Sequence, residues 1–203
     1  RQVASVINRY GVTSFCAPPT VYRYLARKGI PPMPTLEHAS TAGEYLSPDI
    51  FRLFREKTGL KLHEGYGQTE TVLLTADFQG DAAPGSMGRP SPLFDVRILR
   101  PDGSEASAGE IGEIAVIPKG VRKAAGIFSD YLGSSQLYSY AWRGGAYHTG
   151  DMAWKDDDGI FWFHGRGDDV IKSGGFRIGP GEIEDILSTH PAVMECSVVG
   201  VPD

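Results

Sequence analysis

Residues 165–178 combine three cations, two adjacent carboxylates and four glycines. Glycine lets a backbone approach a ligand closely, and Arg and Lys supply donors that match phosphate oxygens. Taken alone, such a run is typical of a solvated turn between two strands. Its combination with two further polar motifs, at residues 63–70 and 147–151, favours a nucleotide-binding site.

The second motif, HEGYGQTE at residues 63–70, could supply an aromatic surface and oxygen ligands. Tyr66 lies between two glycines and can offer the face of its ring to a flat base. The Thr69 hydroxyl can donate to a phosphate oxygen, and the Glu70 carboxylate can hold a divalent ion, which prefers oxygen ligands. By itself, the motif favours a turn in which a threonine caps a helix.

The third motif, YHTGD at residues 147–151, ends in an acidic residue that follows a glycine. Asp151 could accept hydrogen bonds from both hydroxyls of a ribose, as acidic residues do in dinucleotide sites, or it could cap a turn. We expect His148 to be a packed or solvent-facing ring, because no Ser or Cys nucleophile is paired with it. The sequence contains no metal-ligand spacing of Cys and His.

Composition is that of an ordinary globular protein of one large or two small domains, with 203 residues, 41% hydrophobic and 22% charged. A net charge of -5 argues against a general nucleic-acid binder, since such binding rests on clustered cations. No apolar run approaches the length of a membrane span, so we expect no membrane insertion. We expect Cys16 and Cys196 to be buried thiols in a reducing, cytoplasmic compartment.

The first part of the chain alternates strands and helices, which is typical of an α/β layer structure. Ser47 followed by Pro48 predicts the start of a helix that ends at Gly59. Thr20 is expected to cap a helix that ends at Gly29. The other elements expected here are a helix over 3–7 and strands over 12–16 and 36–41.

After Pro84 the pattern changes to short strand candidates separated by turn dipeptides. We expect strands over 96–99, 111–117 and 160–163, arranged as an antiparallel sheet or a small barrel. Beyond Asp168, a helix beginning near 180–182 and a strand over 196–201 indicate the start of a βαβ-like unit.

Four segments in this order resemble the adenylate-forming superfamily, which includes acyl-CoA synthetases, adenylation domains of peptide synthetases and firefly luciferase. They are YGQTE at 66–70, GEI at 112–114, YHTGD at 147–151 and residues 165–184, and residues 190–203 match as well. Residues 86–90 and 127–131 look most like acyl-CoA synthetases of the short- or medium-chain type. The resemblance extends over essentially the whole chain.

The resemblance implies an α/β fold in which residues 1–167 belong to a large AMP-binding domain. Residues 1–84 would form its α/β portion, with a parallel or mixed sheet, and 85–167 a β-rich portion with a small distorted β-barrel. Residues 168–203 would begin a small α+β C-terminal domain, with Asp168 as the hinge. The family's phosphate loop and its C-terminal lysine have no counterpart here, so we expect a fragment that is inactive alone.

The resemblance also implies roles for matching residues. Asp151 matches the carboxylate that binds ribose, and Arg166 matches the arginine beside ribose and phosphate. The expected catalytic residues are Thr69, which matches the phosphate-binding hydroxyl, Glu70, which matches the Mg²⁺ ligand, and Lys172, which matches a lysine of the second half-reaction. The remaining matches are, for ATP or AMP, Gly43, Glu44, Tyr45, Tyr66, Gly67 and Arg177, and, for coenzyme A, Gly174, Gly175 and Phe176.

The implied reaction uses ATP, Mg²⁺ and coenzyme A to convert a carboxylic (fatty) acid into a thioester. The acid first forms an acyl-adenylate with release of pyrophosphate, and the thiol of coenzyme A then displaces AMP. Two alternatives stay open: activation of an aryl or amino acid for a carrier protein, and a non-catalytic nucleotide-binding or interaction module. The sequence leaves the acyl chain length and the oligomeric state undetermined.

Overall fold

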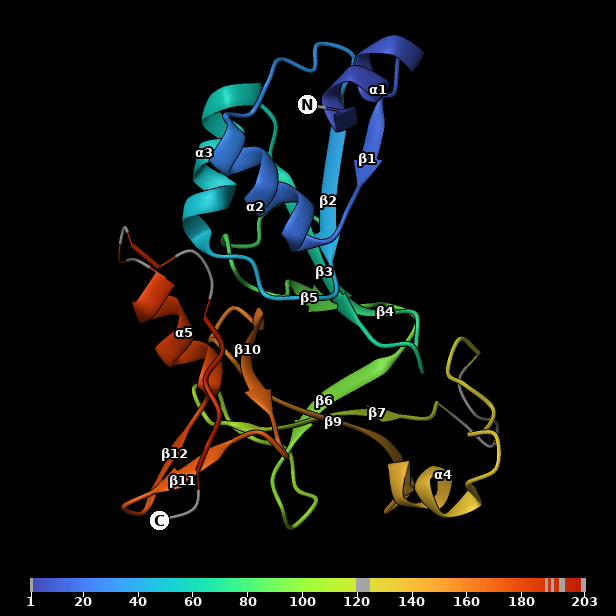
Figure 1. Ribbon diagram of the computed structural model, residues 1–203. Helices are drawn as coiled ribbons and strands as arrows, with labels where there is room; N and C mark the ends of the chain where they lie inside the picture. The colour runs from blue at the N-terminus through green and yellow to red at the C-terminus, as the bar shows by residue number, and fades with distance from the viewer. Residues whose placement is uncertain (1, 120–124, 189, 191, 194–195, 202–203) are drawn as a thin grey trace. The chain divides into compact units, whose positions relative to one another are not determined.

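The computed structural model describes residues 2–119, 125–188, 190, 192–193 and 196–201 (Figure 1). The chain divides into two compact units. The first unit comprises Arg1–Pro92 and Gly126–Phe128, and the second comprises Leu93–Ala125 and Ser129–Asp203. The domain boundary expected at Asp168 stays a prediction.

The first unit is built on a mixed sheet in the order β1-β2-β3-β4-β5. Its parallel strands are β1 (Ser14–Cys16), β2 (His38–Ala42) and β3 (Leu62–Gly67). The strands β4 (Leu73–Ala76) and β5 (Arg89–Pro90) continue the sheet with antiparallel pairing. The α/β class and the mixed sheet expected from the sequence are therefore confirmed.

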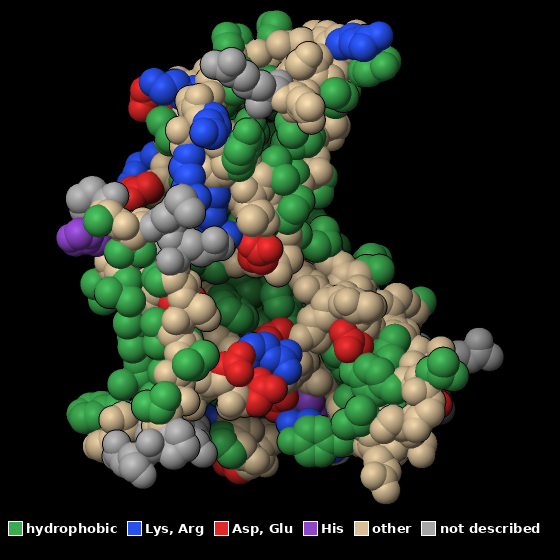
Figure 2. Space-filling view, in the orientation of Figure 1, with side chains coloured by type: hydrophobic (Ala, Val, Ile, Leu, Met, Phe, Trp, Pro, Cys, Tyr) green, Lys and Arg blue, Asp and Glu red, His purple; other side chains and the backbone are tan. Residues whose placement is uncertain are grey.

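Three helices accompany this sheet: α1 (Gln2–Tyr10), α2 (Pro19–Lys28) and α3 (Pro48–Thr58). Figure 1 shows α2 and α3 side by side, and Figure 2 shows basic side chains gathered over them. The ring of Tyr22 meets that of Phe54 edge-on at 5.4 Å, while its hydroxyl donates to Ser40 O at 3.0 Å. The core around this contact includes Ala4, Ile7, Leu25, Leu36, Ala39, Leu46, Phe51 and Leu62.

The sequence predicted where α2 and α3 begin and end, and three of these four positions are confirmed. Pro48 begins α3, and both helices end at the expected glycines, where the Gly59 N–H donates to Arg55 O at 2.8 Å. The predicted cap at Thr20 is wrong, because α2 already begins at Pro19, and the Thr20 hydroxyl instead donates to the Glu44 carboxylate at 3.3 Å. A proline needs no cap for its own missing N–H, so the helix starts two residues earlier than a cap at Thr20 would place it.

The second unit contains an antiparallel sheet in the order β10-β9-β7-β6, and the antiparallel pairing expected here is confirmed. Its closure into a barrel stays a prediction. Buried aliphatic side chains of β6 and β7, such as Ile98, Ile114 and Val116, form its core. The elements are β6 (Asp95–Leu99), β7 (Gly112–Ile117), α4 (Ser135–Ala141), β8 (Trp142–Arg143), β9 (Ala146–Lys155) and β10 (Phe161–Arg166).

The last part of this unit is the hairpin of β11 (Ile171–Ser173) and β12 (Phe176–Ile178), followed by α5 (Pro180–Ser188). The helix expected near 180–182 is confirmed. The strand expected over 196–201 is wrong, since these residues have no strand structure. A strand needs a backbone partner, but the Val198 N–H donates to the Glu184 side chain at 2.8 Å.

Both cysteines are free thiols, as expected, but their predicted burial is wrong: Cys16 is exposed and Cys196 is half-buried. On β1, the half-buried side chain is Phe15, whose ring lies 5.8 Å from that of Tyr22. Successive side chains of a strand point to opposite faces, so Cys16 turns away from the helices. Because β1 is an edge strand, this side chain stays accessible.

A test of the first unit's packing is Gly88→Ala, with Gly59→Ala as its control. Both glycines have φ of 75°, but a Cβ on Gly88 would lie 2.2 Å from the Ala76 carbonyl carbon, whereas a Cβ on Gly59 meets nothing within 4 Å. Both variants bear the left-handed backbone cost of roughly 1–2 kcal/mol. We expect Gly88→Ala to lose about 2 kcal/mol more in urea unfolding, because backbone must move. Equal losses of unfolding free energy in the two variants would contradict the close packing of Gly88 against Ala76.

Candidate nucleotide-binding site

The motif at 66–70 forms the end of β3 and the turn into β4. The Gln68 N–H donates to the Thr71 hydroxyl at 2.9 Å, and the Thr71 N–H donates to Gln68 O at 3.0 Å. A Cβ on Gly67 would come within 2.6 Å of Val72 O, so a glycine is needed here for β3 and β4 to pair this closely. Gly67, which the resemblance assigns to ATP or AMP binding, is therefore also required by the protein's own backbone.

Within this turn, Thr69 is exposed and Glu70 is half-buried. The Glu70 carbonyl oxygen accepts a hydrogen bond from the Phe128 N–H at 2.7 Å, which ties residues 126–128 to the first unit. A hydroxyl beside one carboxylate suits Mg²⁺ held mainly by phosphate oxygens, which takes only one or two protein carboxylates. Among the described residues, no group of three acidic, His or Cys side chains is placed to hold a metal ion.

The segment Gly43, Glu44 and Tyr45 follows β2 and is held by α2. Arg23 donates to the Glu44 carboxylate at 3.0 Å and also to the Tyr45 carbonyl oxygen. The Glu44 side chain is thus directed toward α2, and Arg23 holds the backbone of the loop through its bond to the Tyr45 carbonyl oxygen. Sequence reasoning missed Arg23, because nothing in a helical pattern identifies which cation reaches a loop 21 residues away.

Glu64 on β3 is a half-buried residue whose Oε2 atom is buried, and sequence reasoning also passed over it. Burial raises the pKa of Glu64 to about 8, so it carries a proton near neutral pH. Glu64 lies opposite Thr41 on β2, and Tyr66, two residues on, lies opposite Thr75 on β4. Paired residues share a sheet face. In the described part of the chain, Thr41 Oγ1, Glu64 Oε2 and Thr75 Oγ1 are buried without hydrogen-bond partners, on the face that carries Tyr66.

In the second unit, the structure brings Asp151, Arg166 and Asp168 together. Asp151 on β9 is 5% exposed and lies opposite Arg166 on β10, whose Nη1 donates to Asp151 Oδ1 at 3.2 Å. Arg166 Nε donates to Asp168 Oδ1 at 3.1 Å. This bond raises the pKa of Arg166 and lowers the pKa of Asp168, so both charges are maintained.

Glycines allow the Arg166 guanidinium to lie close to the strand that carries Asp151. Gly150 has φ of 76°, and a Cβ there would lie 3.3 Å from Arg166 Nη2. The Gly167 N–H donates to Gly150 O at 2.7 Å, which joins the two glycine motifs directly. The buried carboxylate and its arginine thus form a pair in which the carboxylate can accept hydroxyl hydrogen bonds and the guanidinium can face an anion.

The hairpin of β11 and β12 carries the residues expected to border coenzyme A. Gly174 and Gly175 form its turn with φ of 57° and 85°, and Phe176 is 72% exposed. Lys172 and Arg177 are paired across the hairpin by their backbones, and their side chains lie outside the described part of the structure. The convergence of the first-unit motifs and the Asp151 group on one adenylate stays a prediction.

The chain belongs to the AMP-binding enzyme family, whose model matches residues 1–124. The resemblance to adenylate-forming enzymes inferred from the motifs is confirmed. No helix in the described ranges has the length and apolar character needed to cross a membrane.

Among individual proteins, the chain is similar to the human mitochondrial acyl-coenzyme A synthetase ACSM3, with 44% identity over 206 residues, which is 99% of this chain and 35% of the relative. It therefore spans about a third of that protein's length. The anthranilate CoA ligase AuaEII in complex with anthranoyl-AMP has a TM-score of 0.88 at 32% identity, covering 100% of this chain and 39% of that one. ATP-bound MatB from Rhodopseudomonas palustris has a TM-score of 0.87 at 30% identity, covering 99% and 40%.

Replacing Glu64 with Gln tests the burial of its carboxyl. Because its pKa is raised from 4.5 to about 8, the folded protein keeps a proton in this range that the unfolded chain has released. The free energy of unfolding should therefore fall as pH rises through this window, with at most about 1.4 kcal/mol per pH unit from this group. Urea unfolding across the window should show a shallower decline for Glu64→Gln.

The matched control is Glu56→Gln, whose exposed side chain pairs with Lys57 on the surface of α3. This variant should keep the pH dependence of the unmodified protein. A Glu64→Gln variant with that same pH dependence would show that the Glu64 carboxyl is ionised in the folded state.

Proposed function

We propose that this chain is part of an ATP-dependent acid–thiol ligase that activates a carboxylic acid as its adenylate and transfers the acyl group to coenzyme A. The observation that carries the proposal is the buried Asp151 carboxylate bonded to Arg166, within a chain 44% identical to an acyl-CoA synthetase. ATP-bound and adenylate-bound structures among the similar proteins support the same class of ligand.

The proposed roles of the residues combine the family resemblance with their chemistry. Asp151 accepts hydrogen bonds from the ribose hydroxyls, and Arg166 places its positive charge beside the α-phosphate. Tyr66 stacks on the adenine, with Gly43, Glu44, Tyr45 and Gly67 forming the neighbouring backbone. In the proposed site, the Thr69 hydroxyl donates to a phosphate oxygen.

A carboxylate oxygen of the acid attacks the α-phosphorus of ATP, and the bond to the bridging oxygen breaks to release pyrophosphate. Mg²⁺ held by Glu70 would offset the negative charge of the phosphates. The thiolate of coenzyme A then attacks the acyl carbon, and AMP leaves with the electron pair of the acyl–oxygen bond. Cations on the protein act on both steps by stabilising charge that develops on phosphate oxygens.

We propose that the second step is served by the hairpin beyond Asp168. Gly174, Gly175 and the exposed Phe176 would border the thiol's path, with Lys172 and Arg177 on the same hairpin. Asp168, bonded to Arg166, would be the hinge between the two half-reactions. A domain rotation there exchanges the residues that face one bound adenylate.

A second candidate substrate is an aryl acid, favoured by the likeness to an anthranilate CoA ligase at 32% identity. The 44% identity to a protein named acyl-coenzyme A synthetase favours an aliphatic acid. The same relative is mitochondrial by name, which favours a mitochondrial compartment over the cytoplasm expected from the sequence.

The test is acid-dependent release of pyrophosphate by the full-length protein, measured against aliphatic and aryl acids with and without coenzyme A. Asp151→Asn should lower kcat/KM for ATP about 100-fold, because two charge-assisted hydrogen bonds are weakened. The control is Asp157→Asn, which changes an exposed carboxylate just beyond the end of β9 and should leave the rate near wild type. The 203-residue chain alone should release no pyrophosphate. Absence of acid-dependent release from the full-length protein would overturn the proposal.

A further inference from the structure

We propose that Glu113 is a positioning residue that holds Asp151 in its ribose-binding orientation, an inference that rests on the proposed function. Glu113 lies on β7, and its side chain is 19% exposed. Its Oε2 accepts hydrogen bonds from Arg143 Nη2 at 2.6 Å and from His148 Nδ1 at 2.8 Å, and its Oε1 accepts one from the Gly150 N–H at 3.0 Å. Two of these three donors lie in the segment that leads to Asp151.

This segment requires support because it leaves the regular β7–β9 pairing. Glu113 pairs with Met152, but Ala115 pairs with His148, so β9 has two more residues than β7 between these pairs. A bulge of this kind re-aims side chains and removes backbone groups from the ladder. The removed groups must find other partners, since an unpaired buried N–H is costly.

Side chains supply those partners within the bulge. The Gly150 N–H donates to Glu113, and the Asp151 N–H donates to the Thr149 hydroxyl at 3.1 Å. That hydroxyl in turn donates to Ile114 O at 2.8 Å, next to Glu113 on β7. The backbone that carries Asp151 is therefore fastened to β7 on both sides of Gly150, and its carboxylate is directed to Arg166.

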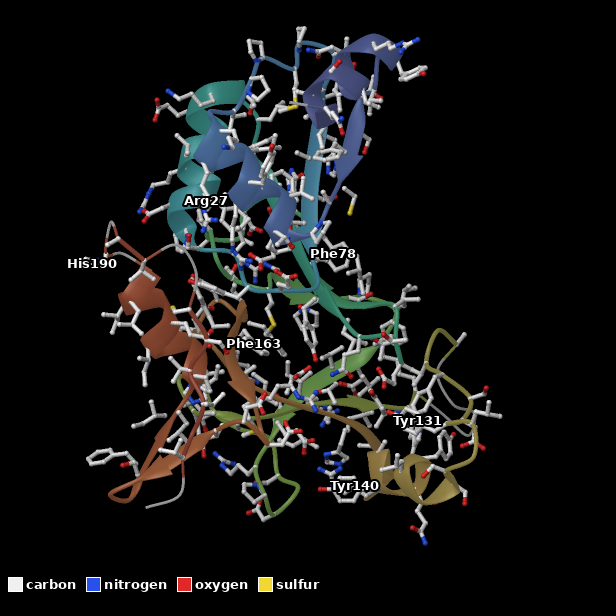
Figure 3. All side chains as sticks on the ribbon, in the orientation of Figure 1. Arg27, Phe78, Tyr131, Tyr140, Phe163 and His190 are labelled. Carbon is white, nitrogen blue, oxygen red and sulfur yellow. The ribbon has the colours of Figure 1, made fainter. Side chains whose placement is uncertain are left out.

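The charge of Glu113 is compensated by Arg143, which has a fixed position of its own. Its Nη1 donates to Tyr140 O at 3.0 Å, and its guanidinium lies 4.7 Å from the centre of the Tyr140 ring, labelled in Figure 3. An ionised carboxylate can accept from all three donors at once, whereas the amide of a glutamine would present one of its NH₂ hydrogens to a donor. The proposed arrangement thus depends on a charged side chain at 113.

The test measures how well the full-length protein distinguishes AMP from 2′,3′-dideoxy-AMP in equilibrium binding. If Glu113 acts through the contact of Asp151 with the ribose hydroxyls, Glu113→Gln should reduce this preference about tenfold by weakening AMP binding, while binding of the dideoxy nucleotide changes little. Glu113→Asp keeps the charge beside Arg143 but is one methylene shorter, and it should show the same selective loss. This second variant keeps the test usable if the Glu113→Gln protein does not fold.

The control is Glu105→Gln, which breaks an exposed ion pair with Lys155 of β9 and should keep the full preference. Full preference in the two Glu113 variants, with normal AMP binding by the wild type, would overturn the role of Glu113 alone. Equal losses for both nucleotides would indicate a general structural role and would also overturn it. Failure of the wild type to bind AMP would overturn this inference together with the proposed function.

Discussion

The pairing of a buried carboxylate with a guanidinium is the interaction on which the candidate site depends. An ionised group removed from water costs several kcal/mol unless donors surround it. Asp151 satisfies this requirement through Arg166, and Arg166 is held in turn by Asp168. Because Asp151 and Arg166 face each other across β9 and β10, the pair exists only when both strands adopt their irregular register. Formation of the charged pair therefore depends on the pairing of β9 with β10.

Glycine makes both polar motifs possible by allowing close backbone approach. At Gly67 the close neighbour is the carbonyl of Val72, and at Gly150 it is the guanidinium of Arg166. At both positions, the protein's own contacts already require a residue without a side chain. The glycines in these motifs allow the close contacts of strand and guanidinium on which the proposed nucleotide site depends.

Two acidic residues show different ways of burying a carboxyl group. Glu113 accepts three hydrogen bonds, one of them from a cation, so its negative charge is compensated where it lies. Glu64 has no such compensation, and burial raises its pKa to about 8, so the group is kept neutral. The first arrangement fixes a neighbouring segment through charge, whereas the second places a protonated carboxyl group on the same strand and sheet face as Tyr66.

Local sequence determined the parts of the structure that depend on local chemistry. Pro48 and Gly59 delimit α3 because a missing N–H and a positive φ are properties of single residues, and the ordered motifs identified the family. Tertiary structure decided the exposure of Cys16, the absence of a strand over 196–201 and the contacts of Arg23 and Glu113. Each of these depends on which distant backbone or side chain lies alongside. The partners of Glu113 are 30 to 37 residues away, a pairing that no local pattern encodes.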